Sequence, residues 1–192
     1  MVKKWQKLAS DKLADYRIFT VWRDKRLSPR TGREHDFFVL DSNDWINVIP
    51  VTAQGKVVLI HQFRHGTGQV TIEIPGGIVD MEDGDPSVAA RRELMEETGY
   101  EADEVIHIGT VEPNPAFLNN KCHTYLALNA RWVQSPQFDG AEDIAVEEVD
   151  LAEIREMTVD GRIAHALVIA AFYHFNRYQA QQTNGTGPSP TE

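Results

Sequence analysis

The spacing of apolar and polar residues along the chain predicts a protein rich in β-strands. Strands are expected where β-branched and aromatic residues alternate with polar ones, or form short apolar runs bounded by turn residues. The expected strands cover residues 16–27, 35–40, 45–52, 56–63, 70–74, 105–111, 122–128 and 144–149. Turn sequences at residues 28–32 and 53–55 are expected to join two pairs of neighbouring strands into hairpins.

One helix, over residues 86–98, has well-marked boundaries. Asp85 is a suitable N-cap, Pro86 suits the first helical turn, and Gly99 suits the C-terminal cap. An acidic, proline-containing loop precedes this helix. These local signals make it the best-defined helix of the sequence.

Further helices are expected at both ends of the chain. Residues 151–157 and 163–178 have helical periodicity, and residues 1–15 have a weak helical tendency. The polar tail, residues 181–192, is expected to be disordered. The order of strands and helices predicts an α/β fold, with a mixed sheet that has helices on its faces.

The composition indicates one globular domain of ordinary size, because the chain has 192 residues of which 42% are hydrophobic. No apolar run approaches the ~20 residues that a membrane helix needs, and no secretory signal is visible at the start. Cys122 is the one cysteine, so an intramolecular disulfide is excluded. We therefore expect a cytoplasmic protein with no membrane partner.

The charge distribution divides the chain into a basic arm and an acidic body. The chain has 19 Lys and Arg against 29 Asp and Glu, a net charge of −10. Residues 1–34 contribute 10 − 4 = +6, which leaves 9 − 25 = −16 for the rest. Such a protein is not expected to bind nucleic acid. The acidic body suits divalent cations and the basic arm suits an anionic ligand, but a merely solvated arm is an equal alternative.

Three carboxylates share one face of the helix at residues 86–98. Glu93, Glu96 and Glu97 stand at positions i, i+3 and i+4, within one arc of the helix. The opposite face is expected to be packed and contains Val88, Leu94 and Met95. Two explanations stay open at this point: Arg91 and Arg92 screen a solvated face, or the carboxylates hold a hard cation such as Mg²⁺ together with substrate phosphates.

The context of the helix favours the cation. The sequence EIPGG, at residues 73–77, ends a strand at a corner whose glycines let backbone carbonyls or a ligand come close. Gly77, the acidic loop and residues 92–100 (RELMEETGY) resemble the Nudix box, written G-x5-E-x7-R-E-U-x-E-E-x-G-U with U aliphatic. The R-E-U-x-E-E-x-G core is complete. The chain is therefore identified as a member of the Nudix hydrolase family.

The box departs from the family pattern at two places. Tyr100 stands where an aliphatic residue is usual. One residue is inserted before Arg92, so counting back from it leads to Gly84, whereas counting forward from Gly77 leads to Asp83. Either Asp83 or Glu82 fills the role of the first glutamate, or that role is vacant.

The resemblance implies a Nudix α/β/α sandwich around a mixed sheet. It implies an N-terminal β-hairpin arm at residues 1–43, serving dimerisation or substrate cover, and a Nudix domain at residues 44–180. Residues 181–192 remain the tail. A homodimer with an exchanged or interlocked arm is expected.

In Nudix hydrolases, helix glutamates bind Mg²⁺ or Mn²⁺, and water attacks a phosphorus of a nucleoside diphosphate linked to another group. The metal ligands implied here are the Gly76 carbonyl, Glu93, Glu96 and Glu97. Arg92 would orient these glutamates. Glu142, in the sequence GAEDI, resembles a catalytic base on a mobile loop, although an ordinary surface carboxylate is the alternative.

Features outside the box resemble the branch that hydrolyses ADP-ribose and other nucleoside diphosphate sugars, including GDP-mannose. Pro115 lies 15 residues past Tyr100, where that branch often has a proline. Arg64 would meet a phosphate and Glu73 would lie near the metal or substrate, but an ordinary strand-end charge is the alternative for Arg64. The residues considered for covering the base are Trp45, Phe37 and Phe38.

Other functions stay open beside the leading one. A hydrolase that removes nucleoside triphosphates or dinucleoside polyphosphates is disfavoured by Pro115 and the N-terminal hairpin. A sensor that binds a nucleotide sugar without cutting it is kept open by the displaced first glutamate. His107, His123 and Cys122 are interpreted as structural residues.

Overall fold

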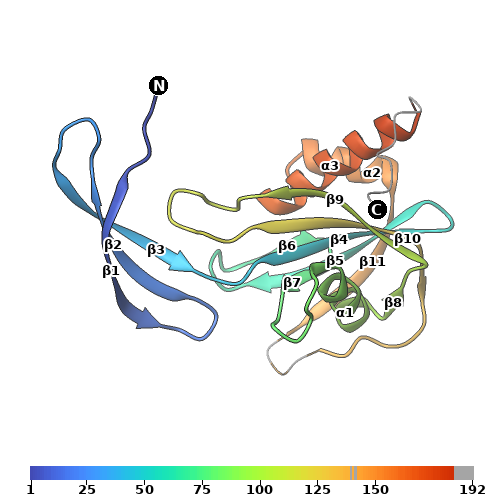
Figure 1. The fold of residues 1–192 in the computed structure, drawn as a ribbon. Coiled ribbons are helices and arrows are strands. Elements are labelled where there is room, and N and C mark those ends of the chain that lie inside the picture. Colours follow the sequence, from blue (N-terminus) through green and yellow to red (C-terminus); the bar gives the residue numbers. More distant parts are fainter. Residues whose placement is uncertain (139, 141, 184–192) are drawn as a thin grey trace. The chain divides into compact units, whose positions relative to one another are not determined.

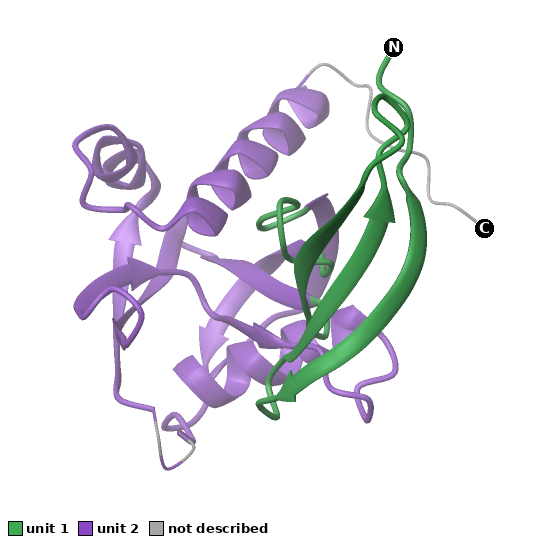
Figure 2. Ribbon diagram, turned by 90° about the vertical axis from the view of Figure 1, so that its left-hand side faces the viewer, with its two compact units in different colours: residues 1–44, 112–121 green, residues 45–111, 122–192 purple. Residues whose placement is uncertain are grey.

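The computed structural model describes residues 1–138, 140 and 142–183. It divides into two compact units (Figure 2). Unit 1 contains residues 1–44 and 112–121, and unit 2 contains residues 45–111 and 122–192. Residues 184–192, most of the expected disordered tail, lie outside the described part of the chain.

Unit 1 is a three-stranded antiparallel sheet in the order β1-β2-β3. Its strands are β1 (Gln6–Asp15), β2 (Thr20–Leu27) and β3 (Glu34–Asp41). The hairpin predicted between β2 and β3 is confirmed. The Gly32 N–H donates to the Ser28 carbonyl over 2.9 Å, and Gly32 has a φ of 67°, which favours glycine.

The helical tendency predicted for residues 1–15 is wrong, because most of this segment is strand β1. Its backbone pairs with β2 from Gln6 opposite Leu27 to Asp15 opposite Thr20. Helix propensity is a weak preference of a few tenths of a kcal/mol per residue, and tertiary pairing overrides it. The partner strand, which is distant in sequence, therefore determines the structure here.

Unit 2 is built on a mixed sheet of eight strands in the order β11-β5-β4-β10-β8, with β6 beside β5, β7 beside β4 and β9 beside β10 (Figure 1). β4 and β10 are parallel and the other pairs of described strands are antiparallel. The strands are β4 (Trp45–Thr52), β5 (Lys56–Arg64), β6 (Gln69–Glu73), β7 (Gly76–Ile78), β8 (Tyr100–Glu101), β9 (Glu104–Val111), β10 (Cys122–Trp132) and β11 (Ile144–Asp150).

Helices cover both faces of this sheet, which confirms the predicted α/β/α sandwich. Helix α1 (Pro86–Thr98) lies on one face, and α2 (Leu151–Val159) and α3 (Ala166–Thr183) lie on the other (Figure 1). The core under α1 includes Leu94 and Val48, and the core under α2 and α3 includes Ile49 and Phe172. Neighbouring residues of β4 thus serve opposite cores, as the alternation of a strand requires.

The boundaries predicted for α1 are confirmed. The Asp85 side chain accepts a hydrogen bond from the Ser87 N–H over 2.7 Å, and Gly99 has a φ of 72°. The packed face was predicted only in part, because Leu94 is buried but Val88 is 48% exposed. The helix packs through Leu94 together with two alanines, two glutamates and a threonine: Ala89, Ala90, Glu93, Glu97 and Thr98.

The C-terminal helix α3 differs slightly from its prediction. It begins at Ala166, three residues later than expected, and continues to Thr183, past the boundary placed at residue 180. None of the helices in the described residues is long and apolar enough to cross a membrane.

His174 of α3 is buried, and neither of its ring nitrogens has a hydrogen-bond partner. Its ring packs against Gly109, where a Cβ would overlap it. Burial lowers the pKa of His174 below its ordinary 6.5, and the charges of Arg177 and His107 lower it further. The unfolded chain therefore binds this proton more readily than the folded chain. Stability from the neutral histidine is present above about pH 6.5 and is lost as the pH falls through the folded pKa.

We expect His174→Phe to reduce the loss of stability between pH 7.5 and pH 5.5, because the variant has no imidazole to protonate. Urea unfolding at several pH values measures the effect. The matched control is His65→Phe, which changes an exposed histidine and should leave the pH dependence as in the wild type. The same pH dependence in His174→Phe and wild type would contradict this account.

Candidate active site

The glutamates of α1 lie against the glycine corner. Glu97 is only 2% exposed, and its Oε2 accepts a hydrogen bond from the Gly76 N–H over 2.8 Å. A Cβ at Gly77 would overlap the carboxylate of Glu93. The corner therefore needs glycines for two reasons: the carboxylate of Glu93 occupies the space beside Gly77, and the Ile46 carbonyl and the Asn47 backbone occupy the space beside Gly76.

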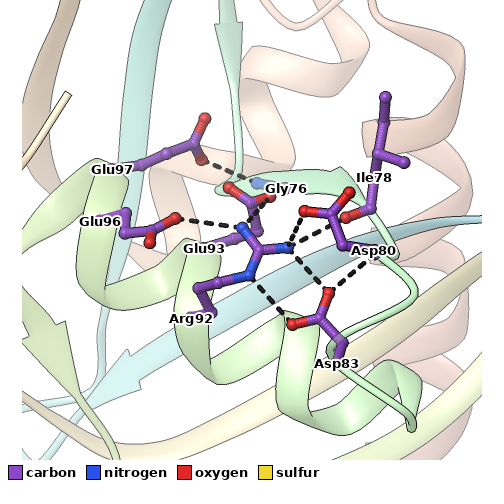
Figure 3. Close-up of polar contacts among 8 residues, drawn as sticks. All are labelled: Gly76, Ile78, Asp80, Asp83, Arg92, Glu93, Glu96 and Glu97. Atoms are coloured by element: carbon purple, nitrogen blue, oxygen red, sulfur yellow. Dashed lines mark hydrogen bonds and ion pairs between the residues drawn. The ribbon is translucent and has the colours of Figure 1, made fainter. Parts of the chain in front are cut away.

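Arg92 connects the carboxylates of this site, as Figure 3 shows. Its Nη1 donates to Glu93 Oε1 over 2.8 Å and to Glu96 Oε2 over 3.1 Å. Its Nη2 donates to the Ile78 carbonyl over 3.1 Å. One guanidinium thus fixes two of the three glutamates relative to the corner, which is the arrangement expected of an orienting arginine.

The inserted residue of the box has a simple structural explanation. Asp83 accepts two hydrogen bonds from Arg92, each 3.0 Å long, and a third from the Asp80 N–H over 2.8 Å. Gly84 follows with a φ of 69° and open space around its Cα. Of the two candidates for the displaced first glutamate, Asp83 meets Arg92 and Glu82 is exposed. Asp83 is therefore the candidate that interacts with the arginine of the box.

The buried carboxylates have strongly shifted pKa values. Burial raises the pKa of Glu97 to about 8. The negative charges of Glu93 and Glu142 also raise this pKa, whereas the hydrogen bond from the Gly76 N–H lowers it. Burial also raises the pKa of Glu93 to about 6, although Arg92 lowers it. Charge is therefore costly at this site unless a cation compensates it.

The donor set suits a hard divalent cation. Within the described residues, no group of three or more His, Cys, Asp or Glu is close enough to enclose a metal ion. Mg²⁺ usually keeps several waters and takes one or two carboxylates together with substrate phosphates. Two buried carboxylates of raised pKa, Glu93 and Glu97, offer oxygen ligands of this kind. The solvated helix face considered from the sequence does not describe them, because both are buried.

Arg64 and Glu73 form a bidentate ion pair. Arg64 Nε and Nη2 donate to the two carboxylate oxygens of Glu73, each over 2.8 Å, and Thr71 Oγ1 donates to Oε1 over 2.6 Å. The Glu73 side chain is 3% exposed and that of Arg64 is 42% exposed. Glu73 therefore holds the guanidinium in one orientation while leaving part of it open.

A cavity of about 290 Å³ adjoins this pair and the glycine corner. The residues that line it include Trp45, Asn47, Arg64, Glu73, Gly76 and His165. Gly76 thus belongs both to the cavity and to the contact with Glu97. The sequence analysis did not select Asn47 or His165, although a lone amide within the apolar run WINVIPVT was a visible signal for Asn47.

Glu142 is half-buried in the loop, two residues before β11 begins. Its negative charge raises the pKa of both Glu93 and Glu97, so its carboxylate acts on the same electrostatic site. Two of its neighbours, Asp139 and Ala141, lie outside the described residues.

The other candidate residues belong to other elements of the chain. Pro115 belongs to unit 1, where it lines a cavity of about 560 Å³ with Trp5, Phe37 and Phe38, so its role at the substrate stays a prediction. The histidines of β9 and β10 have structural partners, as predicted. His107 Nε2 and His123 Nδ1 lie 2.9 Å and 3.0 Å from the hydroxyl oxygen of Thr110.

The mixed sheet, the acidic helix and the glycine corner together define an α/β/α protein of the Nudix type. A family model described as NUDIX domain matches residues 44–172, so the chain belongs to the Nudix family. Nudix hydrolases generally use divalent metal ions.

Similar proteins support this assignment. An ADP-ribose pyrophosphatase of Mycobacterium tuberculosis is 26% identical over 170 residues, which cover 86% of this chain and 80% of the relative. A GDP-mannose pyrophosphatase of Escherichia coli is 30% identical over 169 residues, which cover 81% of this chain and 87% of the relative. A crystal structure of an ADP compounds hydrolase has the same fold, with a TM-score of 0.82 and 20% identity, and the match covers 97% of this chain and 98% of that chain.

Proposed function

We propose that this protein hydrolyses the pyrophosphate bond of a nucleoside diphosphate sugar of the ADP-ribose or GDP-mannose class, with Mg²⁺ or Mn²⁺ as cofactor. The products are a nucleoside monophosphate and a sugar phosphate. One observation carries this proposal: Gly76 joins the buried glutamates of α1 to a cavity that contains Arg64. The activities named for the relatives in M. tuberculosis and E. coli support the substrate class.

The acidic helix supplies the metal ligands. A bound divalent cation would neutralise the diphosphate and orient the attacking water. Glu93 and Glu97 would hold it, with Glu96 and the Gly76 carbonyl as further ligands. Arg92 keeps Glu93 and Glu96 in place through its hydrogen bonds.

Glu142 acts as the general base in this proposal. It takes a proton from the attacking water, whose oxygen forms a bond to one phosphorus. The bond from that phosphorus to the bridging oxygen breaks, and the leaving phosphate takes the electron pair. The influence of Glu142 on the pKa values of Glu93 and Glu97 supports its place near the reacting water.

Arg64 and Trp45 bind the substrate in the cavity. The half-exposed guanidinium of Arg64 meets a phosphate oxygen, while buried Glu73 fixes its orientation. Trp45 offers a flat apolar surface to a sugar or base. Unit 1 contributes three further residues to this proposal. They would bind either the substrate or a second copy of the chain: Pro115, Phe37 and Phe38.

A panel of nucleotide sugars, nucleoside triphosphates and dinucleoside polyphosphates, assayed with Mg²⁺ and with Mn²⁺, tests the proposed function. We expect the highest kcat/KM for a nucleoside diphosphate sugar. A preference for triphosphates or dinucleoside polyphosphates would favour the alternative hydrolase. Binding without turnover would favour the sensor.

We further propose a homodimer formed through unit 1, in the cytoplasm. The strands of unit 1 and the turn between β1 and β2 expose several large apolar side chains: Leu8, Leu13, Tyr16, Ile18, Phe37 and Phe38. Exposed apolar patches of this kind mark interaction surfaces. Cys122 is the one cysteine of the sequence, so the chain has no intramolecular disulfide that would require an oxidising compartment.

Size-exclusion chromatography with light scattering measures the oligomeric state. We expect the full-length protein to have the mass of a dimer. A variant lacking residues 1–43 should be monomeric, because it loses the apolar sheet of unit 1. The double variant Phe37→Ser and Phe38→Ser keeps the whole chain and should also weaken the dimer. Full-length protein that is monomeric at micromolar concentration would refute the proposal.

A further inference from the structure

One wall of the cavity in unit 2 has no role in the reaction proposed above. It is the N-terminus of α3, a helix of 18 residues. The His165 carbonyl accepts hydrogen bonds from the N–H groups of Val168 and Ile169, each over 3.1 Å, so His165 is the residue that precedes the first turn. The first N–H groups of a helix have no partner within it and have partial positive charge.

Asn47 of β4 brings an unpaired acceptor to this wall. Its side chain is buried, with 6% of the residue exposed, and its Nδ2 donates to the Leu167 carbonyl over 3.3 Å. Because a carbonyl can only accept, the amide nitrogen must face Leu167, which determines the orientation of the amide. Asn47 Oδ1 is then left buried and without a hydrogen-bond partner. Such an oxygen costs free energy until a donor reaches it.

His165 brings a second unpaired atom to the same cavity. Its Nδ1 is buried and has no hydrogen-bond partner. Depending on the tautomer, this nitrogen donates or accepts. The wall thus combines three groups: an acceptor oxygen, a ring nitrogen that can donate or accept, and the N–H groups at the start of a helix. They lie beside the buried carboxylate of Glu73.

This combination selects a hydroxyl group over a phosphate. A phosphate at neutral pH has oxygens that accept, so it leaves Asn47 Oδ1 unpaired. A hydroxyl donates to Asn47 Oδ1 and at the same time accepts from a helix N–H or from His165. We infer that this wall binds a sugar hydroxyl of the substrate, with Asn47 and His165 as specificity-determining residues. This inference rests on the proposed hydrolysis of a nucleoside diphosphate sugar.

Either sugar of the substrate can provide this hydroxyl: the ribose of the nucleoside or the sugar on the second phosphate. The test therefore compares ADP-ribose with two analogues, one lacking a hydroxyl on the adenosine ribose and one lacking a hydroxyl on the terminal ribose. The wild-type protein should prefer ADP-ribose over one of them by at least ~10-fold in kcat/KM. The analogue that is rejected identifies the sugar that occupies the wall.

Asn47→Ala should reduce this preference to about 1, mainly by raising KM for ADP-ribose. His165→Phe should also reduce this preference. This second variant alters the residue before a helix and leaves the buried sheet unchanged. Each preference is a ratio measured within one protein sample, so a reduced fraction of folded enzyme cancels. The matched control is Asn176→Ala, an exposed position on α3 outside this cavity, which should keep the wild-type ratio.

The possible results distinguish a failure of this inference from a failure of the proposed function. If the wild type hydrolyses ADP-ribose and both analogues equally well, the inference is wrong and the proposed function stands. The same holds if the wild type discriminates and both Asn47→Ala and His165→Phe keep the full ratio. If no nucleotide sugar is hydrolysed, the proposed function itself fails.

Discussion

Replacing Glu97 with glutamine is expected to lower kcat for a nucleoside diphosphate sugar by at least ~10³-fold, with the protein still folded. Glutamine has nearly the same shape and can still accept the hydrogen bond from the Gly76 N–H. It cannot provide the negative charge that a divalent cation requires. The measurement is the steady-state rate at saturating Mg²⁺, together with the affinity for Mn²⁺ by calorimetry.

The pH dependence of metal binding provides a second measurement on this variant. The pKa of Glu97 is raised to about 8, so this carboxyl is mostly protonated at pH 7 without a metal. A cation binds the carboxylate form and must release the proton. Metal affinity of the wild type should therefore rise between pH 6.5 and pH 8.5, and the part of this rise due to Glu97 should vanish in Glu97→Gln.

The same shift predicts the effect on stability. A raised pKa in the folded state means that folding favours the protonated form. The stability due to that form is present below the ordinary pKa of about 4.5 and is lost as the pH rises through about 8. Glu97→Gln should therefore be at least as stable as the wild type at pH 8 in EDTA. Loss of activity with lower stability would indicate misfolding instead.

Glu96→Gln is the matched control for Glu97→Gln. Glu96 lies on the same helix and also contacts Arg92, but its side chain is 43% exposed. A smaller loss of activity, about 10-fold or less, is expected for an outer ligand whose hydrogen bond survives the change. Equal losses in both variants would contradict the assignment of Glu97 as the main ligand.

Local signals predicted much of the fold because they act within a few residues. The cap residues Asp85 and Gly99 mark the limits of α1, and the apolar runs at β4 and β5 mark two central strands. Strand β1 was missed because only its pairing with β2 makes it a strand. Its sequence has no alternation that indicates such a partner.

The sequence likewise predicted only part of the candidate site. The i, i+3 and i+4 spacing predicts that Glu93, Glu96 and Glu97 share one helix face, but it cannot say which of them are buried. That depends on the corner, where Gly77 leaves room for the carboxylate of Glu93. Likewise, the contact of Asp83 with Arg92 depends on the loop before α1, where the Asp80 N–H donates to the Asp83 side chain, and the spacing of the box does not describe that loop.

Asn47 and His165 show what sequence reasoning does not reach. They are 118 residues apart by number, 165 − 47, and they line one cavity because α3 begins beside β4. An amide within an apolar strand indicates that some partner exists. It does not indicate that the partner of Nδ2 is a carbonyl at a helix start, or that Oδ1 is left without one.

Glu142→Gln is expected to lower kcat by at least ~10²-fold and to leave the affinity for Mn²⁺ within a few-fold of the wild type. Glutamine cannot take a proton from the attacking water, whereas the proposed metal ligands on α1 are unchanged. The control is Glu147→Gln on the following strand β11, a residue whose carboxylate pairs with His61 at the surface. That variant should keep a rate close to that of the wild type.

If Glu142 is the base, Glu142→Gln must lower kcat without lowering the affinity for the metal. The charge of Glu142 raises the pKa of Glu93 and Glu97, so removing it should make both carboxyls easier to ionise but should also weaken the attraction for a cation, and these two effects on metal affinity oppose each other. A base therefore loses rate without losing metal, whereas a metal ligand loses both together. A near-normal rate in Glu142→Gln would transfer the role to the carboxylates of α1, because these are the other acids beside the cavity with pKa values close to neutral.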